Sequence, residues 1–317
     1  MSNNKKTKFV LALALAGWLF AGYFFFAGPT VPVEKEADAV AQYPYINKAI
    51  TADIGKHFII NFKPLKDKFL EIQKRYTGKT YVYFVYLNNA SWVGLGEKEM
   101  FYAASTVKVP MAMSLLRAVE EKKLSMADKY TLQDFDMNKD FGELYKDGAD
   151  TEISAGQLQT LMLEKSDNTA TLAIAHILTG IGMTDPLINV YKFMGWEYNS
   201  LGENPNYLNI NLKTLANMFV ALYDAQYVNV GDSNDILNHL SNSSFDDKIV
   251  AGVPRNVKVA HKEGNGGSYK AYSDCGIVYA SSRHYILCVA VDGGTESVAN
   301  DFISEISRAT YGFVMNN

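Results

Sequence analysis

A serine and a lysine three residues apart are the first candidates for chemistry in this chain. Ser105 and Lys108 lie in the stretch AASTVKVPMA, residues 103–112, and side chains at this spacing on a helix share one face. A hydroxyl held beside a neutral amine can act as a nucleophile with its own base. The spacing alone says little, because Ser2 and Lys5 repeat it in the N-terminal stretch MSNNKK. Other parts of the sequence have to support it.

Two further polar triplets lie at the ends of predicted elements. The triplet Ser-Asp-Asn at 166–168 separates two apolar patterns of helical spacing, within LMLEKSDNTATLAIA. The triplet Lys-Glu-Gly at 262–264 follows an apolar strand pattern, within VKVAHKEGNGGSYKAY. A second Lys-x-Gly, at 146–148, has no strand before it. Each triplet alone would suit an ordinary helix or strand end, but three elements in this order and context are hard to produce by chance.

The sequence does not contain the motifs of other kinds of catalytic site or of metal sites. The five histidines show no His-x-x-x-His spacing and no cysteine at ligand spacing. The stretch DFDMNKDFGE from Asp134 is similar to a calcium loop, but glycine at its sixth position and glutamate at its twelfth are missing. No Gly-x-Ser-x-Gly elbow occurs for a Ser-His-Asp triad, and the glycines at 264–267 open no helix pattern. We therefore expect no metal and no cofactor.

The order of predicted elements indicates an α+β fold. Strand patterns occur at both ends of the chain, over 80–96 with a turn inside, and near 257–262, 275–280 and 284–291. The stretch from about 109 to 223 reads as largely helical, and an amphipathic helix over 298–313 closes the chain. We expect the strands from both ends to form one antiparallel sheet with flanking helices and an inserted all-helical region.

The three motifs together resemble those of a known enzyme family. S-x-x-K at 105–108, S-D-N at 166–168 and K-x-G at 262–264, in this order, resemble the motif set of class A serine β-lactamases and related penicillin-binding proteins. The similarity runs from roughly residue 55 to the C-terminus. It implies that family's fold, a sheet with flanking helices plus an all-helical half, which agrees with the layout predicted above.

The resemblance implies a role for each polar group. Ser105 would attack a carbonyl carbon, and Lys108 would take its proton, since burial and the nearby cation of Lys262 both lower a lysine pKa. Ser166 would relay a proton to the leaving nitrogen, and Asn168 would orient the substrate amide. These are the groups that acyl transfer from an amide requires.

The resemblance also implies that the substrate lies along the second triplet. Lys262, Glu263, Gly264 and Asn265 would border it. The backbone N–H groups of Ser105 and Asn265 would hold the developing oxyanion. We expect a helix to begin at about Ser105, because the first N–H groups of a helix lack partners within it.

Glu263 departs from the family pattern, which has a hydroxyl residue at this position. That hydroxyl helps to hold a carboxylate of the substrate. Two like charges about 5 Å apart repel by roughly 3 kcal/mol at an effective dielectric constant of ~20. Either Glu263 points away, for example toward a lysine, or the substrate is not the usual anion.

The deacylation step is the second departure. Class A enzymes carry a glutamate in a long loop, where it activates the deacylating water, but here the segment after MGWEYNSLGEN is short. Glu203 is the one carboxylate near the expected place, and its E-x-x-L-N context is missing. We favour Glu203 as a surface turn residue and keep it as a candidate for the deacylation base. The sequence thus predicts slow deacylation.

The N-terminal residues predict export. Residues 9–28 contain no charge, and about twenty helical residues span about 30 Å, the thickness of a bilayer core. Lysines before this segment and acids after it orient residues 1–8 toward the cytoplasm as a tail. We expect a single-pass signal-anchor in the cell membrane at 9–28 and a linker at 29–50. The hydrolase domain, 51–317, would be extracytoplasmic. A signal peptide cleaved after an Ala-x-Ala site is the alternative.

The two cysteines lie in strand patterns on either side of Ser281 and Ser282. If these serines form a tight hairpin loop, Cys275 stands opposite Cys288. An oxidising compartment could then close a cross-strand disulfide. The sequence favours the other interpretation, two small buried residues that remain unbonded.

Charge and motifs together predict the function. The net charge of −4 and a pI near 5.8 argue against nucleic acid as a partner. We predict an exported, membrane-anchored serine hydrolase that forms an acyl-serine intermediate, with a β-lactam or a peptidoglycan-type peptide as substrate. A penicillin-binding D-alanyl-D-alanine peptidase is the alternative among enzymes. A catalytically silent binding module at the cell surface is the other alternative, against which the intact Ser105, Lys108, Ser166 and Lys262 argue.

Overall fold

The computed structural model of the chain describes residues 44–45, 60–183, 185–195 and 208–317. They belong to the larger of two compact units, Tyr43–Asn317. Segment 9–28, most of the linker 29–50 and Glu203 lie outside the described residues, so the predicted anchor and domain boundaries stay predictions. Among the residues that are described, none of the helices combines the length and the apolar character that crossing a membrane requires.

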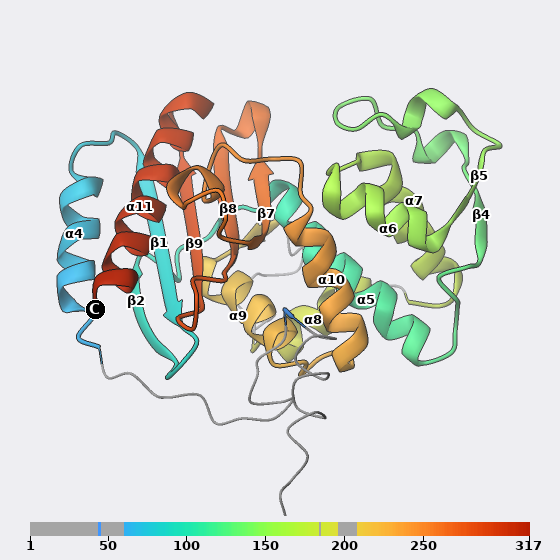
Figure 1. Ribbon diagram of the computed structural model, residues 1–317. Helices are drawn as coiled ribbons and strands as arrows, with labels where there is room; N and C mark the ends of the chain where they lie inside the picture. Colours follow the sequence, from blue (N-terminus) through green and yellow to red (C-terminus); the bar gives the residue numbers. More distant parts are fainter. Residues whose placement is uncertain (1–43, 46–59, 184, 196–207) are drawn as a thin grey trace, which may run out of the picture. The chain divides into compact units, whose positions relative to one another are not determined.

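A five-stranded antiparallel sheet forms the centre of this unit (Figure 1). The strands follow the order β2-β1-β9-β8-β7. Their bounds are β1 Lys79–Tyr86, β2 Ser91–Leu95, β7 Val259–Asn265, β8 Ala271–Val278 and β9 Tyr285–Asp292. Because β1 pairs with β9 along its whole length, strands from both ends of the chain share one sheet. The predicted α+β fold class is confirmed.

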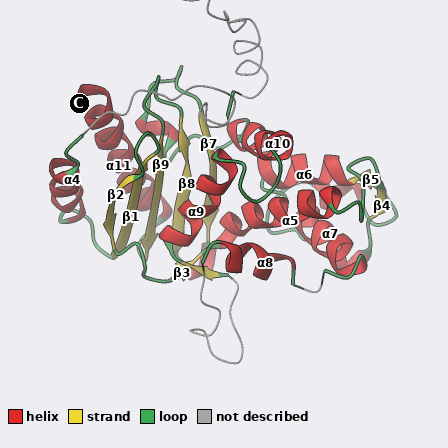
Figure 2. Cartoon of the chain, turned by 90° about the horizontal axis from the view of Figure 1, so that it is seen from below, coloured by secondary structure: helices red, strands yellow, loops and turns green. Residues whose placement is uncertain are grey.

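Helices cover both faces of the sheet (Figure 2). α4 (Lys63–Gln73) and α11 (Glu296–Asn316) lie on one face, and α9 (Leu212–Tyr223) lies on the other. Side chains of α4, α11 and the sheet form one apolar cluster, which includes Phe69 and Phe302. Because both faces are covered, seven of the eight residues of β1 are buried. This burial explains the continuous apolar run of β1, where a half-exposed strand would alternate.

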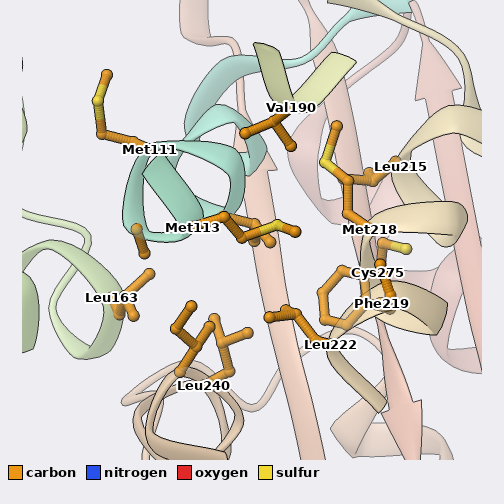
Figure 3. Close-up of a cluster of buried hydrophobic side chains, with 14 of the residues drawn as sticks. Met111, Met113, Leu163, Val190, Leu215, Met218, Phe219, Leu222, Leu240 and Cys275 are labelled. Atoms are coloured by element: carbon orange, nitrogen blue, oxygen red, sulfur yellow. The ribbon is translucent and has the colours of Figure 1, made fainter. Parts of the chain in front are cut away.

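The helices of the inserted region pack around α5 (Lys108–Glu120), of whose 13 residues ten are buried. Its neighbours are α6 (Ala155–Glu164), α7 (Asn168–Gly180), α8 (Pro186–Phe193) and α10 (Val230–Ser241). Figure 3 shows Met113 of α5 among apolar side chains of α6, α8, α9, α10 and β8. The second apolar core of the unit therefore lies between α5 and the sheet.

Two short ladders accompany the helices of this region. β4 (Lys129–Thr131) pairs with β5 (Glu152–Ser154), and β3 (Phe101–Tyr102) pairs with β6 (Asn209–Ile210). The sequence did not predict them, because strands of two or three residues leave no periodic pattern. The β3–β6 pair matters for the site, since β3 ends just before Ser105.

The hairpin of β8 and β9 brings the two cysteines together. Cys275 and Cys288 are directly opposite in the register, as the count from Ser281 and Ser282 predicts, and both are fully buried. The structure joins them by a disulfide bond. The interpretation that the sequence favoured, two unbonded cysteines, is therefore corrected, because side chains directly opposite on antiparallel strands are close enough to bond.

Removing the disulfide should lower stability measurably. The bonded residues are separated by 13 positions in the sequence. A cross-link over such a loop restricts the unfolded chain and thereby raises the free energy of unfolding by about 3 kcal/mol. Urea denaturation with and without reductant should show this loss in the wild type and none in a Cys275→Ala/Cys288→Ala variant. Equal wild-type midpoints in the two conditions would show that the bond does not stabilise the fold.

Candidate active site

Ser105 lies on a 3₁₀ turn, Ala104–Val107, that leads directly into α5. The chain before the turn is held by the β3–β6 pair and by a hydrogen bond from Ala103 N to Leu208 O (2.6 Å). The turn begins one residue before the predicted start at Ser105. Ala104 has a positive φ of 47°, a conformation that a residue with a Cβ keeps only where its surroundings enforce it.

Lys108 is 2% exposed at the start of α5. Its amine donates hydrogen bonds to Ser166 O (2.5 Å), Ser166 Oγ (3.1 Å) and Asn168 Oδ1 (2.8 Å). Asn168 is itself oriented, because its Nδ2 donates to Asn138 Oδ1 (3.2 Å). Burial, and then the charge of Lys262, hold the pKa of Lys108 well below its usual value of 10.5. The amine can therefore be neutral, as a general base must be.

Ser166 to Asn168 form the tight connection between α6 and α7. Ser166 has a positive φ of 55° and directly precedes the residue that caps α7. That residue, Asp167, accepts a hydrogen bond at Oδ1 from Ala170 N (2.9 Å), which satisfies one of the unpaired N–H groups at the helix start. The cap fixes the backbone on which the Ser166 hydroxyl is carried.

The second carboxylate oxygen of Asp167 fixes the neighbouring loop. It accepts hydrogen bonds from the backbone N–H groups of Glu143 (2.7 Å) and Leu144 (2.9 Å). A Cβ on Gly142 would lie 2.1 Å from this oxygen, so only glycine leaves room. Within the Ser-Asp-Asn triplet, the aspartate therefore has a structural task, whereas the serine and the asparagine contact Lys108.

Lys262 approaches Ser166 from the sheet. It is fully buried on β7, and its Nζ donates to Ser166 Oγ (3.0 Å) and to Glu263 O (3.4 Å). Burial lowers the pKa of Lys262 to about 8, although Glu263 and Asp274 oppose the shift. The Ser166 hydroxyl thus lies between the amines of Lys108 and Lys262 and can exchange protons with both.

Gly264 allows β7 to approach the turn that carries Ser105. A Cβ at this position would lie 2.6 Å from Ala103 O and 2.7 Å from Ser273 Oγ. β7 and the 3₁₀ turn pack against each other here. The glycine of the Lys-Glu-Gly triplet is therefore required by a close approach of two backbones.

Asn265, the last residue of β7, is held from two sides. Its Nδ2 donates to Glu296 Oε1 (2.6 Å), and its Oδ1 accepts a hydrogen bond from Gly267 N (3.0 Å). Ser105 and Asn265, whose N–H groups are the predicted oxyanion donors, thus belong to two segments in mutual contact. Their role stays a prediction.

The carboxylate of Glu263 forms an ion pair with Lys248, which is 2% exposed. Burial raises the pKa of Glu263, and the charge of Lys248 opposes this shift. Burial lowers the pKa of Lys248, but Glu263 and other carboxylates outweigh it, so that the pKa of Lys248 is raised. Of the two possibilities that the sequence left open, the structure has the pairing with a lysine. Glu263 nevertheless borders the cleft described next.

Six of the candidate residues share one cleft, with a volume of about 1030 Å³, whereas Lys262 and Gly264 lie on β7 outside its lining. The cleft is bordered by Ser105, Lys108, Ser166, Asn168, Glu263 and Asn265. The sequence analysis missed both Lys248 and the aromatic residues of the lining, which are Tyr102, Phe141, Phe245 and Tyr269. The rings of Phe141 and Phe245 lie 5.8 Å apart, and the ring of Phe245 lies 5.5 Å from Lys262 Nζ. No sequence signal marks these residues, because segments that are distant in the chain bring them together.

A deacylation base and metal ligands are two further kinds of group that such a site can contain. Glu203, the candidate deacylation base, is outside the described residues, and its role stays a prediction. Within the described ranges, no three or more His, Cys, Asp or Glu side chains are grouped so that they could hold a metal ion.

Comparison with known proteins agrees with this site. The family model for the beta-lactamase enzyme family matches residues 64–314. The chain therefore belongs to the beta-lactamase enzyme family and is a serine hydrolase. It is 24% identical over 224 residues to the β-lactamase SME-1 of Serratia marcescens, an alignment that covers 67% of this chain and 75% of that protein.

Solved structures share the fold. The structure of PBP-A has a TM-score of 0.71 and 20% sequence identity, over 80% of this chain and 97% of that chain. A β-lactamase from Sphaerobacter thermophilus has a TM-score of 0.70 and 19% identity, over 81% of this chain and 99% of that chain. The resemblance predicted from the three motifs is confirmed.

The lowered pKa of Lys108 should make stability depend on pH. Folded Lys108 loses its proton well below 10.5, whereas unfolded Lys108 keeps it up to 10.5. Between the two pKa values the unfolded chain binds more protons, so stability should rise with pH by up to about 1.4 kcal/mol per pH unit.

Chemical denaturation at pH 8, 9 and 10 checks this. The rise should be less steep in Lys108→Met, in which Lys262, with its pKa lowered to about 8, still contributes, and unchanged in Lys129→Met, a control at an exposed lysine. Parallel stability curves for the wild type and Lys108→Met would contradict a lowered pKa.

Proposed function

We propose that a β-lactam or a peptidoglycan-type peptide amide acylates Ser105 in this cleft. The observation that carries the proposal is the buried amine of Lys108, which bonds to Ser166 and Asn168 in the cleft that Ser105 borders. Burying an amine is unfavourable, and here the burial supplies a neutral base one helical turn from a hydroxyl. That combination suits acyl transfer to a serine.

The acylation step assigns each group a task. The Ser105 oxygen bonds to the carbonyl carbon, and its proton passes to the amine of Lys108. The backbone N–H groups of Ser105 and Asn265 hold the oxyanion. When the C–N bond breaks, Ser166 Oγ donates its proton to the leaving nitrogen and regains one from Lys108, with which it shares a hydrogen bond. Lys262 stabilises negative charge that develops on Ser166 Oγ, 3.0 Å away.

The solved relatives support a β-lactam as one substrate. A mutant of PBP-A, with a TM-score of 0.72 and 20% identity to this chain, was solved as an acyl-enzyme complex with penicillin G. We propose the same acylation, by a β-lactam, for Ser105 of this chain. The acylation uses the groups described above and no cofactor.

We also propose that the reaction takes place outside the cytoplasm, at the cell membrane. Residues 9–28 would act as a single-pass anchor. The Cys275–Cys288 disulfide supports this location, because disulfides persist in oxidising compartments.

Fluorescent penicillin should label the purified protein covalently through Ser105. The label should survive denaturing electrophoresis and be absent from Ser105→Ala. The labelling rate should rise with pH through the lowered pKa of Lys108, because only the neutral amine accepts a proton. Lys108→Arg should abolish labelling, since arginine stays protonated, whereas the exposed control Lys129→Arg should label normally. An active Lys108→Arg variant would remove Lys108 from the mechanism, and labelling of Ser105→Ala would overturn the proposal.

The acyl-enzyme should break down slowly. A step that lacks its general base slows by ~10²–10⁴-fold, and Glu203, the one carboxylate near the place of the family's glutamate in the sequence, lacks the E-x-x-L-N context. Stopped-flow kinetics with a chromogenic cephalosporin should give a burst equal to the enzyme concentration, followed by little turnover. This behaviour would favour the penicillin-binding peptidase alternative, which shares the acylation step. Steady turnover at about 10 s⁻¹, typical of enzymes, would contradict slow deacylation, and its loss in Glu203→Gln would identify Glu203 as the base.

A further inference from the structure

Carboxylates border the cleft on the surface, although buried lysines lie at the site behind it. Among the described residues, the acidic side chains at the border of the cleft are Asp140, Asp246, Asp247, Glu263 and Glu296. All of these except Glu263 are exposed, whereas Lys108, Lys248 and Lys262 are buried. A substrate that enters the cleft therefore meets negative charge first.

The ammonium group closest to these carboxylates is already paired. Lys248 forms an ion pair with Glu263 and lies 3.5 Å from Asp247 Oδ1. Two carboxylates thus share one ammonium group, which leaves a net negative charge. Because Lys248 is nearly inaccessible to solvent, a carboxylate of the substrate could pair with it only by displacing Glu263.

The first turns of α11 orient two of the exposed carboxylates. Glu296 and Asn300 are four residues apart and share one helix face. Glu296 Oε1 accepts a hydrogen bond from Asn265 Nδ2 (2.6 Å), and Asp247 Oδ2 accepts one from Asn300 Nδ2 (2.5 Å). These amide donors are uncharged, so they fix the carboxylates without neutralising them. Glu263, Asp247 and Glu296 therefore form an acidic strip along β7 and the start of α11.

Aromatic faces border the same cleft. The rings of Tyr102 and Tyr269 stack, with centroids 4.3 Å apart and an interplanar angle of 18°. Tyr269 is 65% exposed, so one side of this stack is open to solvent and to ligands. The face of an aromatic ring attracts cations, above all quaternary ammonium groups. The acidic strip and the tyrosine stack are thus both complementary to positive charge.

We propose that the enzyme prefers substrates whose leaving fragment carries a cationic nitrogen. The inference rests on the proposed function, because it assigns a substrate class to the same Ser105 site. The leaving fragment is the part concerned because Ser166, the proton donor to the leaving group, and Glu263 border the same cleft. Lys262, which bonds to Ser166, also donates to the backbone oxygen of Glu263. A carboxylate at that place would meet Glu263, whereas an ammonium group would meet an attractive partner.

Three thioesters of N-phenylacetylglycine test this preference, because they share one acyl group and differ in the leaving thiol. The thiols are thiocholine, which is cationic, 3,3-dimethylbutane-1-thiol, which is neutral and has the same shape, and 3-mercaptopropionate, which is anionic. In each reaction Ser105 Oγ bonds to the carbonyl carbon and the C–S bond breaks, after which water releases phenylacetylglycine. A disulfide reagent detects the thiol, and both cysteines of the chain are occupied in their own disulfide.

We expect kcat/KM to fall from the cationic to the neutral to the anionic thioester. The cationic thioester should exceed the anionic one by about ten- to a hundred-fold at low salt. This ratio should shrink in about 0.5 M salt, where the Debye length falls to a few ångströms. Single-turnover mixing separates acylation from slow deacylation.

Charge variants locate the source of the preference. Asp246→Asn/Glu296→Gln should lower the ratio of cationic to anionic kcat/KM about ten-fold. Glu263→Gln leaves Lys248 without its partner and should shift the ratio further toward the anionic thioester. Glu152→Gln, a control at an exposed carboxylate of β5 outside the cleft, should leave the ratio unchanged.

The outcomes separate the two proposals. Equal Ser105-dependent rates for the three thioesters, or a ratio that Asp246→Asn/Glu296→Gln leaves unchanged, would overturn the cationic preference while the proposed function stands. If none of the thioesters shows release that depends on Ser105 while fluorescent penicillin still labels Ser105, the preference is overturned and the proposed function stands; if both fail, both proposals are overturned.

Discussion

An amine that is buried at the start of a helix needs hydrogen-bond acceptors, because it has lost the water that solvated it. Lys108 finds them in Ser166 and Asn168. The start of α5 therefore has to lie beside the connection between α6 and α7. That connection has to be tight, because it places a carbonyl, a hydroxyl and a side-chain amide within hydrogen-bond distance of the Lys108 amine. Asp167 makes the connection rigid by capping α7 and by binding the preceding loop.

The sheet completes the site from the opposite side. Lys262 reaches Ser166 from β7, and Gly264 lets that strand touch the turn that carries Ser105. β7 is an edge strand, so one side of it remains open toward the cleft. The sheet itself depends on the pairing of β1 with β9, which joins the two ends of the described domain. Residues that act on one substrate are thus positioned by contacts between segments far apart in the chain.

Burial lowers the pKa of both lysines beside Ser166, and the main neighbouring charges act on the two in opposite directions. Lys108 is next to the cation of Lys262, and its pKa falls far. Lys262 has the carboxylates of Glu263 and Asp274 nearby, and its pKa falls only to about 8. Burial raises the pKa of Glu263, and the charge of Lys248 opposes that shift. Glu263, which stands where the family has a hydroxyl residue, therefore has two effects. It adds a carboxylate at the border of the cleft, and it raises the pKa of Lys262 relative to that of Lys108.

The sequence by itself determined the features that depend on local spacing. These are the shared turn of Ser105 and Lys108, the placement of the two triplets at element ends, the α+β layout and the opposed cysteines. The tertiary structure alone decided the pairing of Glu263 with Lys248, the aromatic lining of the cleft and the bonding of Cys275 to Cys288. Lys248 precedes Glu263 by fifteen residues, and no periodicity of helix or strand relates the two positions. Their pairing follows from burial, because a charge removed from water has to find an opposite charge among whatever segments pack around it.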